Sequence, residues 1–245
     1  MIDRLSQSMQ VLQRLMKAQE MTANNMANLN TPGFKADKLF YHSFKEMVNG
    51  EEVSKVVPRQ TINMEQGNFE ATGNPYDLAI QGNGFFKVEL NGVELLTRNG
   101  RFHPDSNGFL VNDQGASLLG SGGPVMIPNF EQTGNAENEY RLEISSDGSI
   151  LLNDKVHDNI ELATVEKIET LQRHSSGYFM VPDGVELMID EDSTLRQGFY
   201  EAGNVNPLKE LTEMMTNATL FESQQKVITT TDELLSRATN SLGKF

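Results

Sequence analysis

The stretch from Pro207 to Leu242 constrains this chain most, because it contains no glycine and no further proline that would interrupt a helix. Apolar residues recur in it every seventh position, which is the period of a helix that packs along one face against another helix. Asn206 is a good N-cap, a proline suits the first helical position, and Gly243 favours a helix end. The stretch predicts one helix roughly 50 Å long. Its apolar positions are Met214, Phe221, Ile228, Leu235 and Leu242, with a second row at Leu220, Val227 and Leu234.

Residues 1 to 31 show the same period and predict the helix that packs against the first one. They also lack glycine and proline. Their apolar positions are spaced alternately three and four apart, like the a and d positions of a coiled coil, and Gln19 is the polar interruption. These positions are Ile2, Leu5, Met9, Leu12, Met16, Gln19, Ala23 and Met26.

Two interpretations fit this pair of terminal helices. Amphipathic helices most often form an intramolecular hairpin or pack in the core of one globular domain, and the alternative is self-assembly through coiled coils. Several seam positions are weak, which makes the isolated pair marginal and favours neighbouring subunits as further partners. The weak positions are Gln19, Ala23, Ala218, Gln225 and Asp232.

The net charge of −14 is confined to the middle of the chain. Residues 1–34 carry three basic and two acidic side chains, residues 208–245 carry four and five, and residues 35–207 carry thirteen and twenty-seven. Nearly neutral ends and an acidic middle predict that the ends pack together while the middle faces solvent, although solubility alone also explains an acidic excess. No basic patch with interleaved aromatic residues is present, so nucleic acid is not an expected partner.

The chain contains no cysteine, which excludes disulfides and cysteine metal sites. This absence fits either a reduced compartment or passage through an oxidising one. No stretch approaches the length of a transmembrane span, so the chain is not expected to insert into a membrane. A cleavable signal peptide is not expected either, because polar residues interrupt the N-terminal region at Gln7, Gln10, Gln13 and Arg14.

Between the two helices the signals change from helix to β structure. The first helix is expected to stop near Asn30, before a Thr-Pro-Gly turn. Residues 35–66 predict an extended connector with a short helix around residues 39–48. From Gly67 onward, turn signals separate short alternating apolar runs, as a β region requires.

The β region is predicted as a series of hairpins. Asn91-Gly92 predicts a turn between strands at residues 85–90 and 93–98, and Asp147-Gly148 predicts one between Tyr140–Ile144 and Ile150–Leu152. The expected fold class is α+β, with terminal heptad helices pairing as a coiled coil around a central, mainly antiparallel β domain. Further strands are expected at residues 78–80, 159–165, 178–181, 185–189 and 194–202, with a loop at residues 121–138 separating two β lobes.

None of the candidate chemical motifs has the context that its chemistry needs. The Gly82-Asn83-Gly84 run resembles the start of a dinucleotide loop, but Lys87 replaces the third glycine and a strand is expected to follow. The run from His103 to Gly108 has the spacing of half a calcium loop, yet Gln114 occupies the position that requires a bidentate glutamate. No catalytic, cofactor-binding or metal-binding residue is therefore predicted, and no small-molecule substrate is expected.

Three blocks of this sequence resemble the bacterial flagellar basal-body rod and hook protein family. They occur in the family's order and span both ends and the centre, whereas residues 120–200 are less similar. Thr219 departs from the pattern, since the family usually has an arginine three residues before Glu222. The blocks are Ala23-Asn24-Asn25-Met26-Ala27-Asn28 with Thr31-Pro32-Gly33-Phe34-Lys35; Gln81-Gly82-Asn83-Gly84-Phe85-Phe86 continuing to Thr97-Arg98-Asn99-Gly100-Arg101-Phe102; and Gly203-Asn204-Val205-Asn206 leading to Lys226-Val227-Ile228 and Asp232-Glu233-Leu234-Leu235.

The resemblance implies a structural subunit of the flagellar rod, closest to the single-domain proximal or distal rod proteins. Such a protein passes unfolded through the flagellar type III export apparatus without a cleaved signal and polymerises with itself and other rod and hook subunits in the basal body. Its terminal helices form the inner coiled-coil layer. The implied domains are residues 1–34, the connector 35–66, the β domain 67–205 and the helix 206–245. The expected assembly residues are Leu5, Met9, Leu12, Met16, Asn24, Asn25, Asn28, Phe34, Met214, Phe221, Ile228 and Leu235.

Two other functions remain as alternatives at this stage. An enzyme would need a pocket with perturbed titratable groups. An extracellular or periplasmic calcium-binding, adhesive β module with oligomerising helices would need a calcium site in its turns.

Overall fold

The computed structural model describes residues 2–48, 51–127, 141–175 and 177–242 of the 245-residue chain. The chain divides into two compact units. The helical unit contains residues 1–27, 37–62 and 205–245, and the β unit contains residues 28–36 and 63–204. Each unit is thus built from segments that are distant in the sequence.

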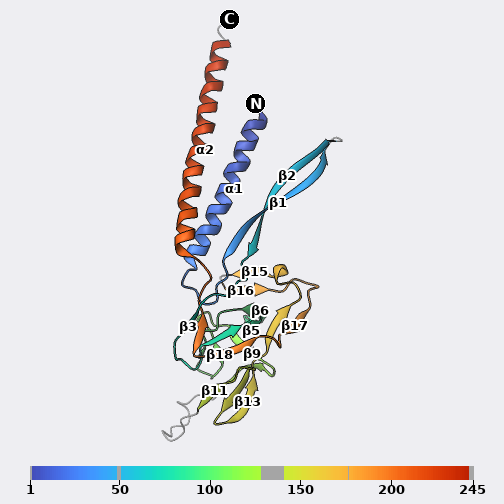
Figure 1. The fold of residues 1–245 in the computed structure, drawn as a ribbon, viewed down its shortest axis with the longest axis vertical. Coiled ribbons are helices and arrows are strands. Elements are labelled where there is room, and N and C mark those ends of the chain that lie inside the picture. Colours follow the sequence, from blue (N-terminus) through green and yellow to red (C-terminus); the bar gives the residue numbers. More distant parts are fainter. Residues whose placement is uncertain (1, 49–50, 128–140, 176, 243–245) are drawn as a thin grey trace. The chain divides into compact units, whose positions relative to one another are not determined.

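The helical unit consists of two long helices and one long hairpin. Helix α1 spans Ile2–Ala27 and helix α2 spans Pro207–Leu242. They run side by side in opposite directions (Figure 1). Asn206 caps α2 as predicted, because its Oδ1 accepts a hydrogen bond from the Lys209 backbone N–H at 3.1 Å. Asn28 follows α1 in a turn, close to the predicted helix end.

The expectation of a short helix around residues 39–48 is wrong, because these residues form strand β1. Strands β1 (Asp37–Val48) and β2 (Glu51–Ile62) pair antiparallel along their whole length, from Asp37 opposite Ile62 to Val48 opposite Glu51. This segment contains Phe40, Tyr41 and Phe44, and aromatic residues are enriched in strands. A partner segment rich in valine, with an Asn-Gly turn signal before it, decides in favour of the hairpin.

The β unit is mainly antiparallel, as predicted. The hairpin around Asn91-Gly92 is confirmed, since both turn residues have the positive φ angles, 54° and 79°, that a two-residue turn needs. A ten-stranded sheet has the path β15-β16-β6-β5-β9-β8-β7; in addition, β14 pairs with β5, β17 with β14 and β10 with β9. The first strands are β3 (Phe69–Ala71), β4 (Leu78–Gln81), β5 (Phe85–Leu90), β6 (Val93–Thr97), β7 (His103–Pro104), β8 (Leu110–Val111), β9 (Ser117–Gly120) and β10 (Gly123–Pro124).

The second half of the β unit contains the other predicted strands. Strands β11 and β12 form the hairpin expected around Asp147-Gly148, although Tyr140 and residues 128–138 of the expected loop lie outside the described residues. Gly198, with φ +80°, divides the run expected at 194–202 into two strands. The elements are β11 (Leu142–Ile144), β12 (Ser149–Leu152), β13 (Lys155–Asn159), β14 (Leu162–Val165), the 3-10 helix η2 (Ile168–Thr170), β15 (Gln172–Ser175), β16 (Tyr178–Met180), β17 (Leu187–Ile189), β18 (Thr194–Gln197) and β19 (Phe199–Glu201).

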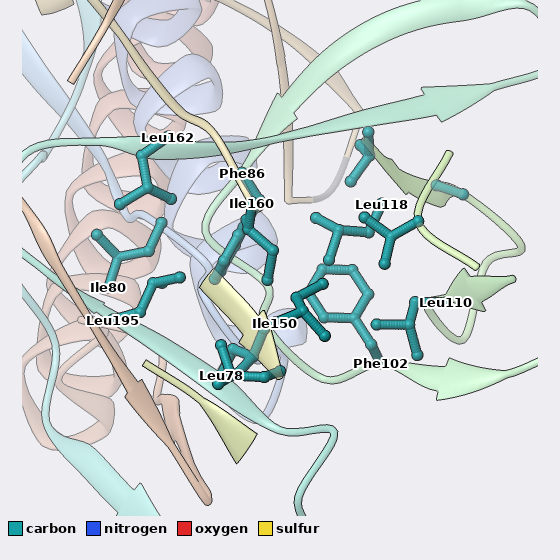
Figure 2. Packing of buried hydrophobic residues seen from close by; sticks show 14 of the residues in the cluster. Leu78, Ile80, Phe86, Phe102, Leu110, Leu118, Ile150, Ile160, Leu162 and Leu195 are labelled. Atoms are coloured by element: carbon teal, nitrogen blue, oxygen red, sulfur yellow. The ribbon is translucent and has the colours of Figure 1, made fainter. Parts of the chain in front are cut away.

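One apolar core holds the sheets of the β unit together. Figure 2 shows side chains from the ten-stranded sheet, from the β4–β18 pair and from β12 meeting in this core. Phe86 is fully buried in it, and its ring lies edge-on to that of Phe102 at 5.4 Å between centroids. The core includes Leu78, Ile80, Phe86, Val88, Leu95, Phe102, Leu110, Leu118, Ile144, Ile150, Ile160, Leu162 and Leu195.

The burial of Phe86 leads to the first prediction. Phe86→Ala should lower the free energy of unfolding of the β unit by about 3–5 kcal/mol, because the mutation removes buried apolar contacts and leaves a cavity. Urea denaturation of the full chain measures this loss. Val93→Ala, at an exposed hairpin position, is the control and should change stability by less than about 0.5 kcal/mol. Equal effects of the two substitutions would contradict this description of the core.

Candidate assembly surface

The two terminal helices pack on each other through a seam that is only partly apolar. In each helix the half-buried residues recur at three- and four-residue spacing, which marks the face turned toward the other helix. Leu12 and Leu15 of α1 and Phe221 and Ile228 of α2 supply its apolar part. Its polar part includes Gln19, Asn217, Gln224 and Thr231.

Much of the apolar surface of α1 lies outside this seam. Met9 and Met16 are more than half exposed, whereas Leu12 is half-buried. At about 100° per residue, the expected a and d stripe of α1 is rotated by about 60° from the face that contacts α2. The side chain of Leu5 lies outside the described residues. This apolar flank of α1 is therefore uncovered in the single chain.

Helix α2 exposes apolar side chains on both sides of the seam. Leu220, Val227 and Leu234 lie about 100° around the helix in one direction from Phe221 and Ile228. On the other side lie Leu208, Leu211 and Met215, with Met214 nearer the seam. All of these side chains are more than a third exposed. A single partner helix cannot cover both flanks, and the side chain of Leu235 lies outside the described residues.

Asn25 is buried and ties three parts of the helical unit together. Its Oδ1 accepts a hydrogen bond from the Asp37 backbone N–H at 2.9 Å, and its Nδ2 donates to the Asp37 carbonyl oxygen at 3.0 Å. The same Nδ2 donates to Glu210 Oε1 at 3.3 Å. Asn24 Nδ2 lies 3.4 Å from Asp37 Oδ2. Asn25 thus joins α1 to the start of β1 and to the first turn of α2.

Glu210 is an unusual residue at the beginning of α2, because it is buried without a cationic partner among the described residues. Its Oε1 accepts from Asn25, whereas its buried Oε2 has no hydrogen-bond partner in the described part of the chain. Burial raises the pKa of this carboxyl group, and the neighbouring charge of Glu213 raises it further. The hydrogen bond from Asn25 and the charge of Lys209 oppose the shift.

In the β unit, Glu201 is the centre of a buried ion cluster. Lys35 Nζ lies 2.6 Å from its Oε1 and Arg98 Nη1 lies 3.3 Å from its Oε2, and all three side chains are almost fully buried. The Gly67 N–H donates to Oε1 at 2.7 Å. Burial lowers the pKa of Lys35, and the carboxylate of Glu201 opposes this shift. Burial likewise lowers the pKa of Arg98.

Close contacts of Gly33, Phe34 and Asn204 join the chain segments around this cluster. Gly33 has φ +67°, and a Cβ there would lie 2.2 Å from the Arg98 carbonyl carbon, so a larger residue is excluded. Phe34 is fully buried, and the Arg173 guanidinium lies 4.8 Å from its ring centroid. Asn204 Oδ1 accepts from the Ala36 N–H at 2.7 Å, and its Nδ2 donates to two carbonyl oxygens of residues 63 and 65.

The expected assembly residues whose side chains the structure describes fall into three groups. Met9, Met16 and Met214 present exposed apolar surface, and Leu12, Phe221 and Ile228 line the seam. Asn25, Asn28 and Phe34 are buried, so any effect they have on assembly acts through the packing of this chain, and Asn24 is half-buried. Sequence reasoning missed Lys35, Arg98 and Glu201 as a cluster. The signal was present, because Lys35 and Arg98 lie in the quoted family blocks and Glu201 lies just before the third.

Two turns that suggested ligands use their polar groups for the fold. Asp105 Oδ1 accepts hydrogen bonds from the Asn107 and Phe109 N–H groups, both at 2.8 Å, and so shapes the β7–β8 turn. Strand β5 follows Gly84, so the glycine run does not begin a helix. Within the ranges that the structure describes, no group of three or more histidine and carboxylate side chains has an arrangement that could hold a metal ion. In the same ranges, neither helix has a stretch long and apolar enough to cross a membrane.

The fold defines the class of this molecule: it is an α+β protein with a long helix near each end of the described chain. Sequence models of three related families match it. "Flagella basal body rod protein" matches residues 8–35, "Flagellar hook protein FlgE/F/G D1 domain" matches residues 79–152, and "Flagellar basal body rod FlgEFG protein C-terminal" matches residues 196–242. Lys35, Arg98 and Glu201 each lie in a different matched segment.

Relatives align along nearly the whole chain. Flagellar basal-body rod protein FlgF of Caulobacter vibrioides is 32% identical over 235 residues, covering 92% of each chain. FlgF of Salmonella typhimurium is 30% identical over 242 residues, covering 91% of this chain and 92% of the relative. FlgG of Bacillus subtilis is 28% identical over 253 residues, covering 90% and 92%. This chain belongs to the flagellar basal-body rod protein family.

The ion cluster leads to the second prediction. Glu201→Leu should lower the free energy of unfolding by about 3–5 kcal/mol, because it leaves two buried cations without their carboxylate. Denaturant unfolding of the full chain measures this. Glu143→Ala is the control, since it breaks the exposed pair with Arg141 and should cost less than about 1 kcal/mol. A loss below about 1 kcal/mol for Glu201→Leu would show that the cluster does not hold the β unit together.

The raised pKa of Glu210 leads to the third prediction. The group binds its proton more tightly in the folded chain than in the unfolded chain, so its ionisation opposes folding. As the pH falls from neutral toward this raised pKa, protonation of Glu210 should stabilise the helical unit. Glu210→Gln mimics the protonated form and should be more stable than the natural chain at neutral pH, with the difference shrinking as the pH falls.

Helical circular dichroism during urea unfolding, recorded across this pH range, measures that difference. Glu222→Gln, on the exposed surface of α2, is the matched control and should give a constant difference. If the difference in free energy of unfolding between Glu210→Gln and the natural chain did not change with pH, the raised pKa assigned to Glu210 would be contradicted.

Proposed function

We propose that this rod-family subunit assembles by burying the apolar flanks of α1 and α2 against helices of neighbouring subunits. The neighbours are copies of this chain and other rod or hook subunits of the flagellar basal body. The observation that carries the proposal is the pair of exposed flanks on α2, because they lie on opposite sides of the intramolecular seam. Their heptad spacing supports coiled-coil packing between subunits.

Simple energetics support this proposal. Covering each half-exposed leucine, valine or methionine contributes on the order of 1 kcal/mol, so several such side chains offset the cost of ordering the helices. Within one chain the seam contains Gln19, Asn217 and Gln224, which contribute little apolar burial. The helices therefore gain more from neighbours than from each other.

The two flanks of α2 also favour an open assembly. One flank carries Leu220, Val227 and Leu234, and the other carries different residues at different heights along the helix. Contacts between two different surfaces repeat from subunit to subunit, and when they do not close into a ring they generate a filament or tube. This geometry fits a rod subunit acting as part of the flagellar drive shaft.

Export through the flagellar type III apparatus is a further part of the proposal. The family resemblance supports it, and the absence of cysteine fits a chain that crosses an oxidising compartment. The weak intramolecular seam also supports export of an unfolded chain, since helices that gain most of their stability from neighbours are easily unfolded before assembly. The acidic surface of the central domain, residues 67–205, would then face solvent as the casing of the tube.

The fourth prediction tests the helix flanks. Val227→Glu should raise the concentration needed for assembly by about 10-fold or more, because it places a charge in an apolar contact worth roughly 1.4 kcal/mol or more. Sedimentation velocity and electron microscopy of the full chain, alone and mixed with other rod subunits, measure assembly. Helical circular dichroism should be unchanged.

Thr229→Glu is the matched control, because it adds the same charge at an exposed position about 160° around α2 from Val227. Its assembly should resemble that of the natural chain. Equal losses in the two variants, or a natural chain that stays monomeric under every condition, would contradict assembly through the apolar flanks.

A further inference from the structure

Strand β17 is an edge strand with uncovered apolar side chains. It pairs with β14 alone, Ala163 lying opposite Ile189 and Val165 opposite Leu187, and no described strand pairs with its other edge. Leu187, Met188 and Ile189 are 37%, 41% and 63% exposed. Neighbouring side chains of β17 point to opposite faces of the sheet, so neither face of this strand is covered.

Such an edge is uncommon in a protein that stays monomeric. Exposed edges are usually blunted by short strands, charged residues, prolines or bulges, because an open apolar edge pairs with other chains. Strand β17 has only three residues, but all three side chains are apolar and exposed. The next strand inward shows the contrast, since Leu162 and Val165 of β14 are buried. An uncovered apolar strand of this kind indicates an interaction surface.

The charges around β17 restrict its partner. Glu186 precedes the strand and Asp190, Glu191 and Asp192 follow it, and there is no basic residue between His174 and Arg196. Glu186, Glu191 and Asp192 are exposed. Two copies of β17 facing each other would bring like charges together, which is unfavourable. The partner surface is therefore apolar with a cationic flank.

Strand β13 of this chain has those properties. It lies at the edge of the three-stranded sheet and pairs with β12. Val156, at 71% exposed, is flanked by exposed Lys155, for which the described residues provide no ion-pair partner. His157 and Asn159 are engaged with Met126 and Ser121, which leaves the Lys155–Val156 end of the strand open.

We infer that β17 of one copy packs on the Lys155–Val156 end of β13 in the next copy. Apolar side chains meet in the middle of this contact, and Lys155 lies against the carboxylates that flank β17. The two surfaces differ, so each copy offers one of each and the contact repeats along a row of subunits. The inference rests on the proposed assembly of copies but assigns a contact in the β unit that does not involve the terminal helices.

The natural absence of cysteine makes disulfide mapping a clean fifth test. A full chain carrying Ile189→Cys and Val156→Cys should form a ladder of covalent oligomers when oxidised under assembling conditions. Non-reducing electrophoresis measures the ladder. The control chain carries Ile189→Cys and Val93→Cys, since Val93 is an exposed apolar residue elsewhere in the β unit. It should give at least several-fold less cross-linked product.

Charge exchange tests the same contact. Lys155→Glu and Glu191→Lys, each added separately to the cysteine pair, should reduce the ladder several-fold, and both changes in one chain should restore it. Failure of the combined variant to recover would overturn the assigned partner.

The outcomes separate this inference from the helix proposal. Assembly by sedimentation without a ladder, or equal ladders in both cysteine pairs, overturns the β17–β13 contact and leaves helix assembly in place. In a Val227→Glu chain that cannot form tubes, a ladder specific to the Ile189–Val156 cysteine pair supports the β17–β13 contact, because the contact then forms without helix assembly. A chain that neither assembles nor cross-links overturns both.

Discussion

One buried carboxylate, that of Glu201, joins the segments on which the β unit depends. Lys35 lies 166 residues from it in the sequence and Arg98 lies 103 residues away, yet both place their cations against its oxygens. A buried ion pair adds little net stability, because desolvation offsets most of the attraction. Any arrangement that leaves one of these charges unpaired is penalised by several kcal/mol, so the cluster selects one way of joining the three family-specific segments.

The terminal helices differ from this buried cluster, because much of their apolar surface is not buried within the single chain. The seam between α1 and α2 is half polar, whereas methionine, leucine and valine side chains remain exposed outside it. In a monomeric enzyme such surface would be a liability. The proposed assembly would bury this surface against neighbouring helices, and β17 presents a smaller uncovered apolar surface in the β unit.

Much of this architecture was predictable from local patterns. The α2 boundaries followed from Asn206, Pro207 and the uninterrupted heptads, and the hairpin around Asn91-Gly92 followed from a dipeptide that accepts positive φ at both positions. The helix expected at residues 39–48 was wrong, because a short apolar run does not distinguish helix from strand until its pairing partner is known. Register with β2 supplied that information.

By itself the sequence determined the α+β class, the two terminal helices and the family, because period, caps and turn residues act over a few neighbouring positions. Only the tertiary structure decided which face of α1 meets α2, that Asn25 and Phe34 are buried, and that Lys35, Arg98 and Glu201 meet. Those outcomes depend on contacts between residues tens to hundreds of positions apart. Helical period fixes which residues share a face, but the direction in which that face points is set by what packs against it.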